Sequence, residues 1–171
     1  MTLYLDLDGC FADFDKQLLD CSGIDNTGFR NGEVYSEAEA IRRKTEAHRC
    51  MSIPGFWAQI PLCTDAYRLW DFCQQFRPVI LTALPNLGDW DETVLYEKQL
   101  WIDKYFGFRT PVIYCLRHQK KDVVKSGLQD VLLDDTIQNV TEWVSEGGFG
   151  ILHTDIENSI KKLSYIYREV I

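Results

Sequence analysis

Five short apolar runs constrain the fold of this 171-residue chain more than any other feature. None of them alternates strictly between apolar and polar residues, which is typical of strands buried on both faces of a parallel sheet. The runs are Leu3 to Leu7, Pro78 to Thr82, Pro111 to Cys115, Val131 to Leu133, and Phe149 to His153. Because helical patterns lie between them, the sequence predicts an α/β fold: a Rossmann-like, mostly parallel, five-stranded sheet with helices on both faces.

Helical patterns fill the segments after the second, fourth and fifth runs. Asp89 is predicted to cap a helix whose apolar residues extend from Val94 to Phe106. A stripe from Ile137 to Val144 ends at Gly147-Gly148, a typical helix stop. The last helix repeats apolar residues from Ile156 to Val170 with a period near 3.6 residues.

The interval between the first two runs is too long for one crossover helix. We therefore expect a single domain over residues 1–171, with a core of residues 1–15 and 77–171 and a small helical cap inserted over about 16–76. Ser36-Glu37-Ala38-Glu39 predicts a capping box that opens one helix, and Ala66 to Cys73 predicts a helix that leads back to the sheet. Met51 to Trp57 is expected to be a loop with exposed aromatic side chains.

The chain is acidic, with 18 Lys and Arg, 26 Asp and Glu, and a net charge of −8. It lacks the broad basic face that binds long nucleic acids, and we expect most carboxylates to be solvated. No segment has the pattern of a secretory signal or the roughly 18 apolar residues of a membrane span. We therefore expect a cytoplasmic protein without a membrane partner, whose six cysteines are reduced thiols that pack as small hydrophobes. None of the cysteines forms a C-x-x-C pair, so a zinc ribbon is not supported. Nothing in the sequence indicates an oligomeric state.

Two pairs of acidic residues directly follow apolar runs. The first strand runs directly into Asp6-Leu7-Asp8-Gly9, and the fourth run is followed by Asp134 and Asp135. Because the carboxyl ends of parallel strands meet at one edge of a sheet, the four side chains are expected to converge there. Their repulsion would raise their pKa values, and a bound divalent cation would relieve it. Ligands that are all oxygen favour Mg²⁺.

Hydroxyl and cationic groups follow the other runs. Thr82 and the backbone of Ala83 can hold phosphate oxygens at the end of the second run. The third run is followed by the cationic candidates Arg117, His118, Lys120 and Lys121. Taken singly, each of these residues is more often structural than functional: a helix cap, a strand-end residue or a solvated side chain. In this order they favour phosphoryl transfer to an aspartate, with Mg²⁺ and Lys balancing the charge.

These segments resemble the motifs of the haloacid dehalogenase-like (HAD) phosphatases. Leu5 to Phe14 is similar to the first motif, Ile80 to Ala83 to the second, the Lys120-Lys121 region to the third, and Val131 to Asp135 to the fourth. Within the superfamily the chain is most similar to the 5′(3′)-deoxyribonucleotidase-like branch. Three features support the similarity to this branch: the Asp-Gly-x-x-Ala-Asp-Phe opening, Gly55-Phe56-Trp57, and Leu-Leu-Asp-Asp followed by Asn139, Trp143 and Gly-Gly-Phe-Gly-Ile-Leu.

The resemblance implies roles for the residues of the motifs. Asp6 would be the nucleophile that becomes an aspartyl-phosphate, and Asp8 would protonate the leaving oxygen and then activate water. Gly9 would let the backbone turn sharply beside the phosphate. Asp6, the backbone carbonyl of Asp8, and Asp134 or Asp135 would hold Mg²⁺.

The phosphate would be held by Thr82, the backbone of Ala83 and a lysine of the third motif. Lys121 is preferred over Lys120 because Val123 and Val124 then follow it as an apolar pair. The resemblance also implies that a nucleotide base stacks on aromatic rings under the cap. The candidates are Phe14, Phe56 and Trp57. Phe14 and Phe56 could instead be core residues, and Trp57 is preferred because it follows Pro-Gly-Phe in a predicted loop. Arg117 could contact a phosphate or base, or be an exposed residue at a helix start.

The resemblance thus implies a Mg²⁺-dependent phosphatase for nucleoside (deoxyribonucleoside) monophosphates, which are small phosphate monoesters. Alternative substrates are another small phosphate ester or a nucleic-acid 3′-phosphate end. A receiver-like phosphoacceptor is disfavoured because Tyr114-Cys115-Leu116 places no acid at the third strand end. A catalytically silent Mg²⁺-binding relative is the other alternative that is not an enzyme.

Overall fold

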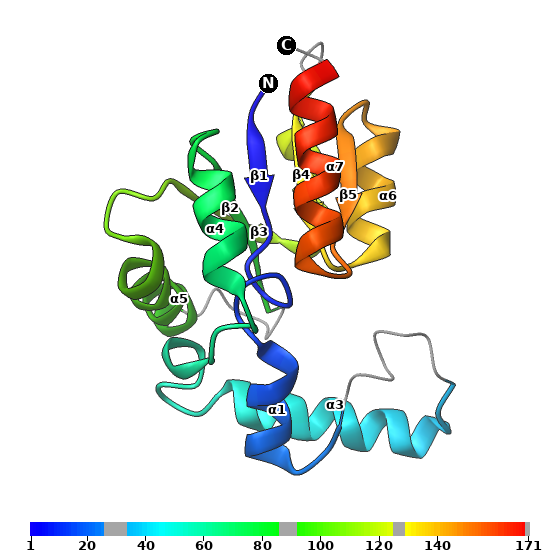
Figure 1. Cartoon of the computed structure of the whole chain (residues 1–171). Coiled ribbons are helices and arrows are strands. Elements are labelled where there is room, and N and C mark those ends of the chain that lie inside the picture. The colour runs from blue at the N-terminus through cyan, green and yellow to red at the C-terminus, as the bar shows by residue number, and fades with distance from the viewer. Residues whose placement is uncertain (26–33, 86–91, 125–128, 170–171) are drawn as a thin grey trace.

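The computed structural model describes residues 1–25, 34–85, 92–124 and 129–169 (Figure 1). One sheet contains β1 (Leu3–Leu5), β2 (Val79–Leu84), β3 (Val112–Leu116), β4 (Val131–Asp134) and β5 (Phe149–Leu152). The strand order is β3-β2-β1-β4-β5, and every neighbouring pair is parallel. Each predicted apolar run supplies one strand, which confirms the α/β fold.

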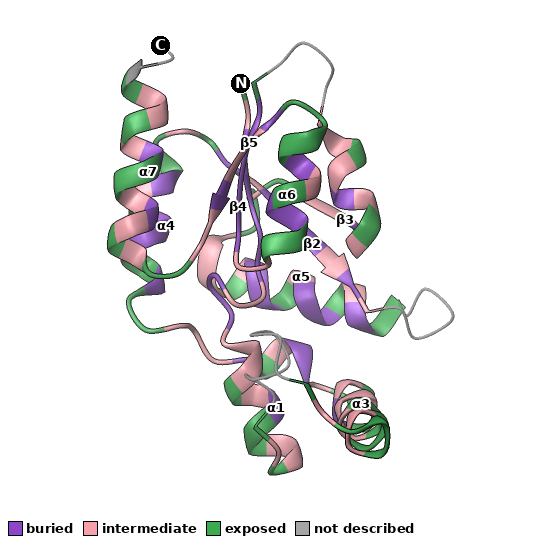
Figure 2. Ribbon diagram, turned by 90° about the vertical axis from the view of Figure 1, so that its right-hand side faces the viewer, coloured by how far each residue is buried: buried purple, intermediate pink, exposed green. Residues whose placement is uncertain are grey.

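Helices cover both faces of the sheet, as predicted (Figure 2). The helices α4 (Ala66–Gln74), α5 (Glu92–Phe106) and α7 (Ile156–Glu169) lie on one face, where their apolar side chains pack with Leu3, Leu5 and Leu133. The other face carries α6 (Ile137–Ser145) and the 3₁₀ helix η2 (Arg117–Val123). There Trp143 of α6 packs edge-on against Tyr4, with ring centroids 5.3 Å apart.

The long insertion after β1 begins with a tight turn. Gly9 has a φ of 84°, and its N–H donates to the carbonyl of Ala12 at 2.8 Å. The insertion then contains α1 (Phe14–Ser22), α3 (Glu37–Met51) and the 3₁₀ helix η1 (Trp57–Gln59). Figure 1 shows α1 and α3 beyond the carboxyl ends of the strands, packed against each other, whereas α4 lies on the sheet beside α7. The two helices α1 and α3 are called the cap below.

The helix ends agree in part with the sequence signals. Ser36 caps α3 as predicted, and its Oγ accepts a hydrogen bond from the N–H of Glu39 at 3.3 Å. The reciprocal half of the capping box does not form, because the Glu39 carboxylate pairs with Arg42 and Arg43. Asp89, the predicted cap of α5, lies outside the described residues. Within those residues, none of the helices combines the length and the apolar composition needed to cross a membrane.

The cysteine prediction is wrong for one pair. Cys21 of α1 and Cys50 of α3 form a disulfide, with their Cα atoms 6.1 Å apart. The two helices pack side by side and bring together thiols that are 29 residues apart in sequence, a proximity that spacing alone does not reveal. Cys10, Cys73 and Cys115 are buried thiols, as expected.

Reduction of the disulfide is expected to destabilise the protein. A cross-link between residues 29 positions apart restricts the unfolded chain and typically stabilises by about 2–4 kcal/mol. Urea unfolding with and without a reductant measures this difference, and the double variant Cys21→Ser/Cys50→Ser is the control that a reductant should not affect. Equal wild-type stability under both conditions would show that this disulfide does not stabilise the fold.

Candidate functional site

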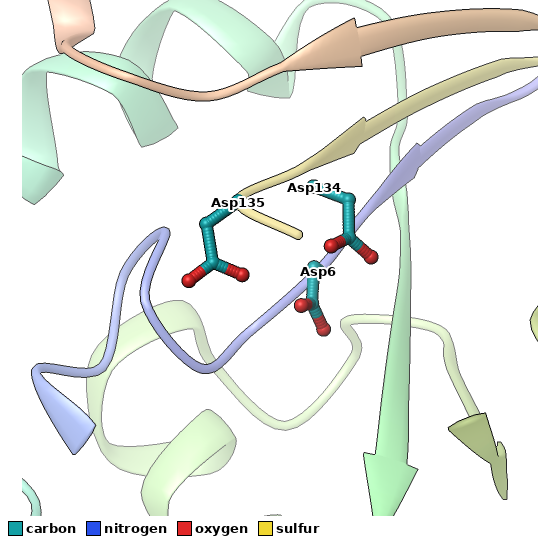
Figure 3. Close-up of side chains that lie close together, drawn as sticks. All are labelled: Asp6, Asp134 and Asp135. Carbon is teal, nitrogen blue, oxygen red and sulfur yellow. The ribbon is translucent and has the colours of Figure 1, made fainter. Parts of the chain in front are cut away.

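Three carboxylates converge at the carboxyl ends of β1 and β4 (Figure 3). Leu5 pairs with Leu133 in the parallel register, so Asp6 and Asp134 occupy the next positions of neighbouring strands. One carboxylate oxygen each from Asp6, Asp134 and Asp135 lies within 4.8 Å of the other two. Asp6 and Asp134 are buried, with 5% and 0% of their surface exposed. The strand register therefore brings together three of the four acidic side chains that were predicted to converge: Asp6, Asp134 and Asp135.

Lys120 supplies the positive charge of this cluster. Its Nζ lies 2.7 Å from Asp6 Oδ1 and 2.7 Å from Asp134 Oδ2, and its side chain is 3% exposed. The preference for Lys121 is thereby corrected, since Lys121 is half-buried and Lys120 contacts the cluster. Successive residues of a 3₁₀ helix point about 120° apart, so only one of two neighbouring lysines in η2 can face Asp6.

Burial and charge act together on the pKa values of these groups. Burial, with the nearby charge of Asp134, raises the pKa of Asp6 well above its usual range, although Lys120 opposes the shift. Burial lowers the pKa of Lys120, but the charges of Asp6 and Asp134 outweigh it and raise that pKa above its usual value. Lys120 is therefore charged at neutral pH and balances only part of the carboxylate charge.

Asp134 is fully engaged by hydrogen bonds. Its Oδ2 accepts from Lys120 at 2.7 Å, its Oδ1 from the N–H of Thr136 at 2.8 Å, and both oxygens from Asn139 Nδ2 at 3.0 Å. Asp135 is half-buried and lines an open cavity of about 660 Å³ together with Gly9. Of these two neighbouring aspartates, Asp135 is therefore the better placed to bind a ligand. In the sequence, Asn139 served only as one of the features of the family resemblance. In the structure it is buried near the start of α6 and donates hydrogen bonds to Asp134.

Asp8 belongs to a second charged pair, which the sequence did not suggest. Its Oδ2 accepts a hydrogen bond from Lys98 Nζ at 2.5 Å, and the same ammonium donates to Thr82 Oγ1 at 3.0 Å. Lys98 is 1% exposed on α5, where it shares the buried face with Trp101 and Ile102. The sequence signal that could have identified Lys98 is its position among the apolar residues Val94, Trp101 and Ile102 of the same helix face.

Glu97, the residue before Lys98, was missed as well. It is 7% exposed, and its carboxylate accepts hydrogen bonds from the N–H groups of Gly55 at 2.6 Å and Trp57 at 3.1 Å. This carboxylate therefore holds the segment that leads from α3 into η1.

A cavity of about 390 Å³ lies beside Asp8. Phe14 and Trp57, whose rings stack with centroids 5.4 Å apart, form part of its wall. Phe56 packs edge-on against both rings. The remaining lining residues are Met51, Ala83, Leu84, Pro85, Leu116, Arg117 and His118.

The expectation of an exposed aromatic loop at Met51 to Trp57 is wrong for its aromatic residues. Phe56 and Trp57 are only 4% and 3% exposed, and the indole N–H of Trp57 donates to the carbonyl of Met51 at 3.1 Å. The reason is that Glu97 and the ring of Phe14 draw this segment against the protein.

The other predicted residues lie around the same edge of the sheet. Thr82 is fully buried in β2, and Ala83 lines the 390 Å³ cavity. Arg117 also lines it, but its Nη1 is directed to α6, 3.2 Å from Asn139 Oδ1 and 3.4 Å from Glu142.

No protein family model and no curated protein matches the chain. Among solved structures, the chain is similar to a hydrolase from Pseudomonas syringae at a TM-score of 0.40 and 14% sequence identity. The match covers 94% of this chain and 89% of that one. We therefore infer the function from the geometry of the site.

Proposed function

We propose that this protein is a Mg²⁺-dependent phosphatase that hydrolyses nucleoside monophosphates, preferably deoxyribonucleoside monophosphates, through an aspartyl-phosphate. One observation carries the proposal. A buried aspartate, Asp6, lies in contact with the buried Lys120 at the sheet edge that also presents Asp8 and Thr82. This is the arrangement expected of an aspartate nucleophile with a cation that balances the charge of a phosphoryl group.

The carboxylate cluster fits a divalent cation. Three acidic side chains within 4.8 Å of one another share one ammonium, so negative charge remains uncompensated among oxygen ligands. Asp6, the backbone carbonyl of Asp8 and Asp135 would hold Mg²⁺, because Asp135 lines the open cavity whereas Asp134 is fully buried. When bound, the ion supplies positive charge that offsets the charge of the phosphate and of the carboxylates.

The side chains of this chain can carry out two displacements. Leu7 N–H and Lys120 hold Asp6 Oδ1, and we assign the attack on phosphorus to Oδ2. A bond forms from Asp6 to phosphorus while the ester bond breaks, and Asp8 gives its proton to the leaving oxygen. Asp8 then takes a proton from water, which attacks the phosphorus of the acyl phosphate, releases phosphate and restores the Asp6 carboxylate.

The cavity beside Asp8 supports a nucleoside as the remainder of the substrate. Two aromatic rings form one wall, while Arg117 and His118 lie at its border. Aromatic rings bind nucleobases by stacking and tolerate different bases.

A panel of monophosphates tests the proposed function. We expect phosphate release in the presence of Mg²⁺ to be faster from deoxyribonucleoside monophosphates than from sugar phosphates or a 3′-phosphorylated oligonucleotide. Preference for a sugar phosphate or for the oligonucleotide end would assign the site to that substrate instead. A chain that releases phosphate from none of them is not a phosphatase for these esters.

Phe14→Leu is expected to weaken the use of nucleotides. Loss of a base–aromatic contact typically removes about 1–3 kcal/mol of binding free energy, so kcat/KM should fall roughly 5- to 150-fold. The same variant should change kcat/KM for glycerol phosphate, which has no base, far less. Phe108→Leu is the matched control because Phe108 is 87% exposed and lines a different cavity. Equal losses for both substrates would refute a stacking role for Phe14.

A further inference from the structure

Lys98 is a buried cation that has no role in the two displacements proposed for Asp6 and Asp8. Its side chain is 1% exposed, and lysines are almost never so buried unless they are paired. Three groups surround its ammonium: the Asp8 carboxylate at 2.5 Å, the Thr82 hydroxyl at 3.0 Å, and the ring of Trp57 at 4.6 Å from the ring centroid. These partners come from the turn after β1, from β2 and from η1, so a single charge contacts three separate segments.

We propose that Lys98 is a positioning residue that fixes the Asp8 carboxylate and the Trp57 ring relative to each other. The inference rests on the proposed function, because it is Asp8 that would transfer the proton there. Lys98 itself is not assigned a bond to the reacting atoms.

The hydrogen bonds of Asp8 show what such positioning achieves. Lys98 holds Oδ2, whereas Oδ1 is buried and accepts no hydrogen bond from the described part of the chain. One oxygen thus anchors the carboxylate, and the other is left for a proton that is shared with substrate or water. Asp8 also lines the cavity proposed for the nucleoside, so the anchored carboxylate borders the substrate.

Glu97 holds the same segment by its backbone. Its two carboxylate oxygens accept from the N–H groups of Gly55 and Trp57, while Lys98 lies against the Trp57 ring. Gly55 has a φ of 87°, a backbone conformation that residues with a Cβ rarely adopt, so this turn is restricted as well. Consecutive residues of α5 therefore have different tasks. Glu97 fixes only the aromatic wall of the cavity, and Lys98 fixes that wall together with Asp8.

This division predicts different kinetic effects for the two residues. Lys98→Met removes the charge but keeps an unbranched apolar stem, and kcat should fall roughly 10²-fold, the cost of a misplaced catalytic group. KM should change little, because the phosphate retains Lys120 and Thr82. Glu97→Gln should instead raise KM several-fold with kcat nearly unchanged, since it loosens the wall and leaves Asp8 anchored.

A matched control exists on the same helix. Lys104 also lies over an aromatic ring, with its Nζ 4.6 Å from the Tyr105 centroid, but it is exposed. Lys104→Met should leave kcat and KM unchanged. Lys98→Met should also shift the fluorescence emission of the protein, and this shift should vanish in a Trp57→Phe background, whereas Lys104→Met should shift nothing in either background.

The outcomes separate the positioning role from its alternatives. Unchanged kcat in a folded Lys98→Met variant overturns the proposal, and a raised KM with unchanged kcat overturns it in favour of direct phosphate binding by Lys98. In an Asp8→Asn background Lys98→Met should cost almost nothing further; an independent loss there shows a role that does not act through Asp8. If Lys98→Met does not fold, Lys98→Gln, which keeps a donor but no charge, is measured by the same criteria.

Failure of the proposed function gives a different result. A wild-type protein that releases phosphate from no monophosphate refutes the function, and with it the task of Asp8. An active wild type whose Lys98 variants retain kcat refutes only the positioning role.

Discussion

Asp6→Asn is expected to abolish phosphate release, with kcat lowered by roughly 10⁴- to 10⁶-fold. An amide has the shape of a carboxylate but is too weak a nucleophile to form the acyl phosphate. Phosphate release under Mg²⁺ saturation measures the loss, and acid quenching with phosphorus-labelled substrate shows whether label remains on the protein. Wild type should retain label, and Asp6→Asn should retain none.

The fold of the Asp6→Asn variant should survive. The raised pKa of Asp6 means that its ionised form opposes folding, an effect that appears as the pH rises above the unfolded value of 3.8 and grows towards the folded pKa. At neutral pH and without added metal, the amide should therefore be tolerated, and Lys120 retains Asp134 as a partner.

Asp71→Asn is the matched control, because Asp71 is exposed on α4 and accepts a hydrogen bond from Gln74 of the same helix. Its turnover should equal that of wild type. Turnover by Asp6→Asn comparable with this control, or label retained on it, would move the nucleophile to another residue.

The sequence predicted the site residues whose positions follow from the pairing of parallel strands, namely Asp6, Asp134 and Thr82. Two apolar runs that pair in parallel must bring their following residues to one edge, so Asp6 and Asp134 could be placed without coordinates. Thr82 was assigned to the same edge for a related reason, because it lies in the neighbouring strand β2.

Contacts made by helices could not be predicted in this way. The choice between Lys120 and Lys121 depends on the rotation of a 3₁₀ helix, which an adjacent apolar pair does not determine. Glu97 lies about 40 residues from Gly55 and Trp57, and Lys98 lies 90 residues from Asp8. The apolar stripe of the helix does not indicate which of its charged residues makes such a contact. The disulfide likewise depends on how α1 packs against α3.

Lys120→Met is expected to impair both stability and turnover. Lys120 is the one ammonium within the described residues that bonds to both Asp6 and Asp134, and removal of one partner from a buried ion pair typically costs about 3–5 kcal/mol. Turnover should be lost as well, because no ammonium then offsets the charge of the phosphoryl oxygens. Chemical denaturation at neutral pH without added metal measures the first effect, and phosphate release measures the second.

The neighbouring lysine provides the control. Lys121→Met removes the same charge one residue later, from a half-buried side chain, and should change stability by no more than about 0.5 kcal/mol. The double variant Lys120→Met/Asp134→Asn should regain part of the lost stability, because it removes one of the two buried carboxylates that Lys120→Met leaves without a cationic partner. Loss of turnover in Lys121→Met with Lys120→Met unaffected would restore the assignment of Lys121.

Added Mg²⁺ connects this variant to the proposed metal site. An ion that binds only the folded state stabilises it in proportion to the logarithm of its concentration relative to Kd. Without the Lys120 ammonium the three carboxylates carry more uncompensated charge, so Mg²⁺ should bind more tightly and raise the Tm of Lys120→Met by more than it raises that of wild type. Since Asp135 is a proposed ligand and Asp134 is not, Asp135→Asn should reduce this increment more than Asp134→Asn does. A Tm that does not respond to Mg²⁺ in either Lys120→Met or wild type would leave the cluster without a cation, and the phosphate would then have to be bound by Lys120 and Thr82 alone.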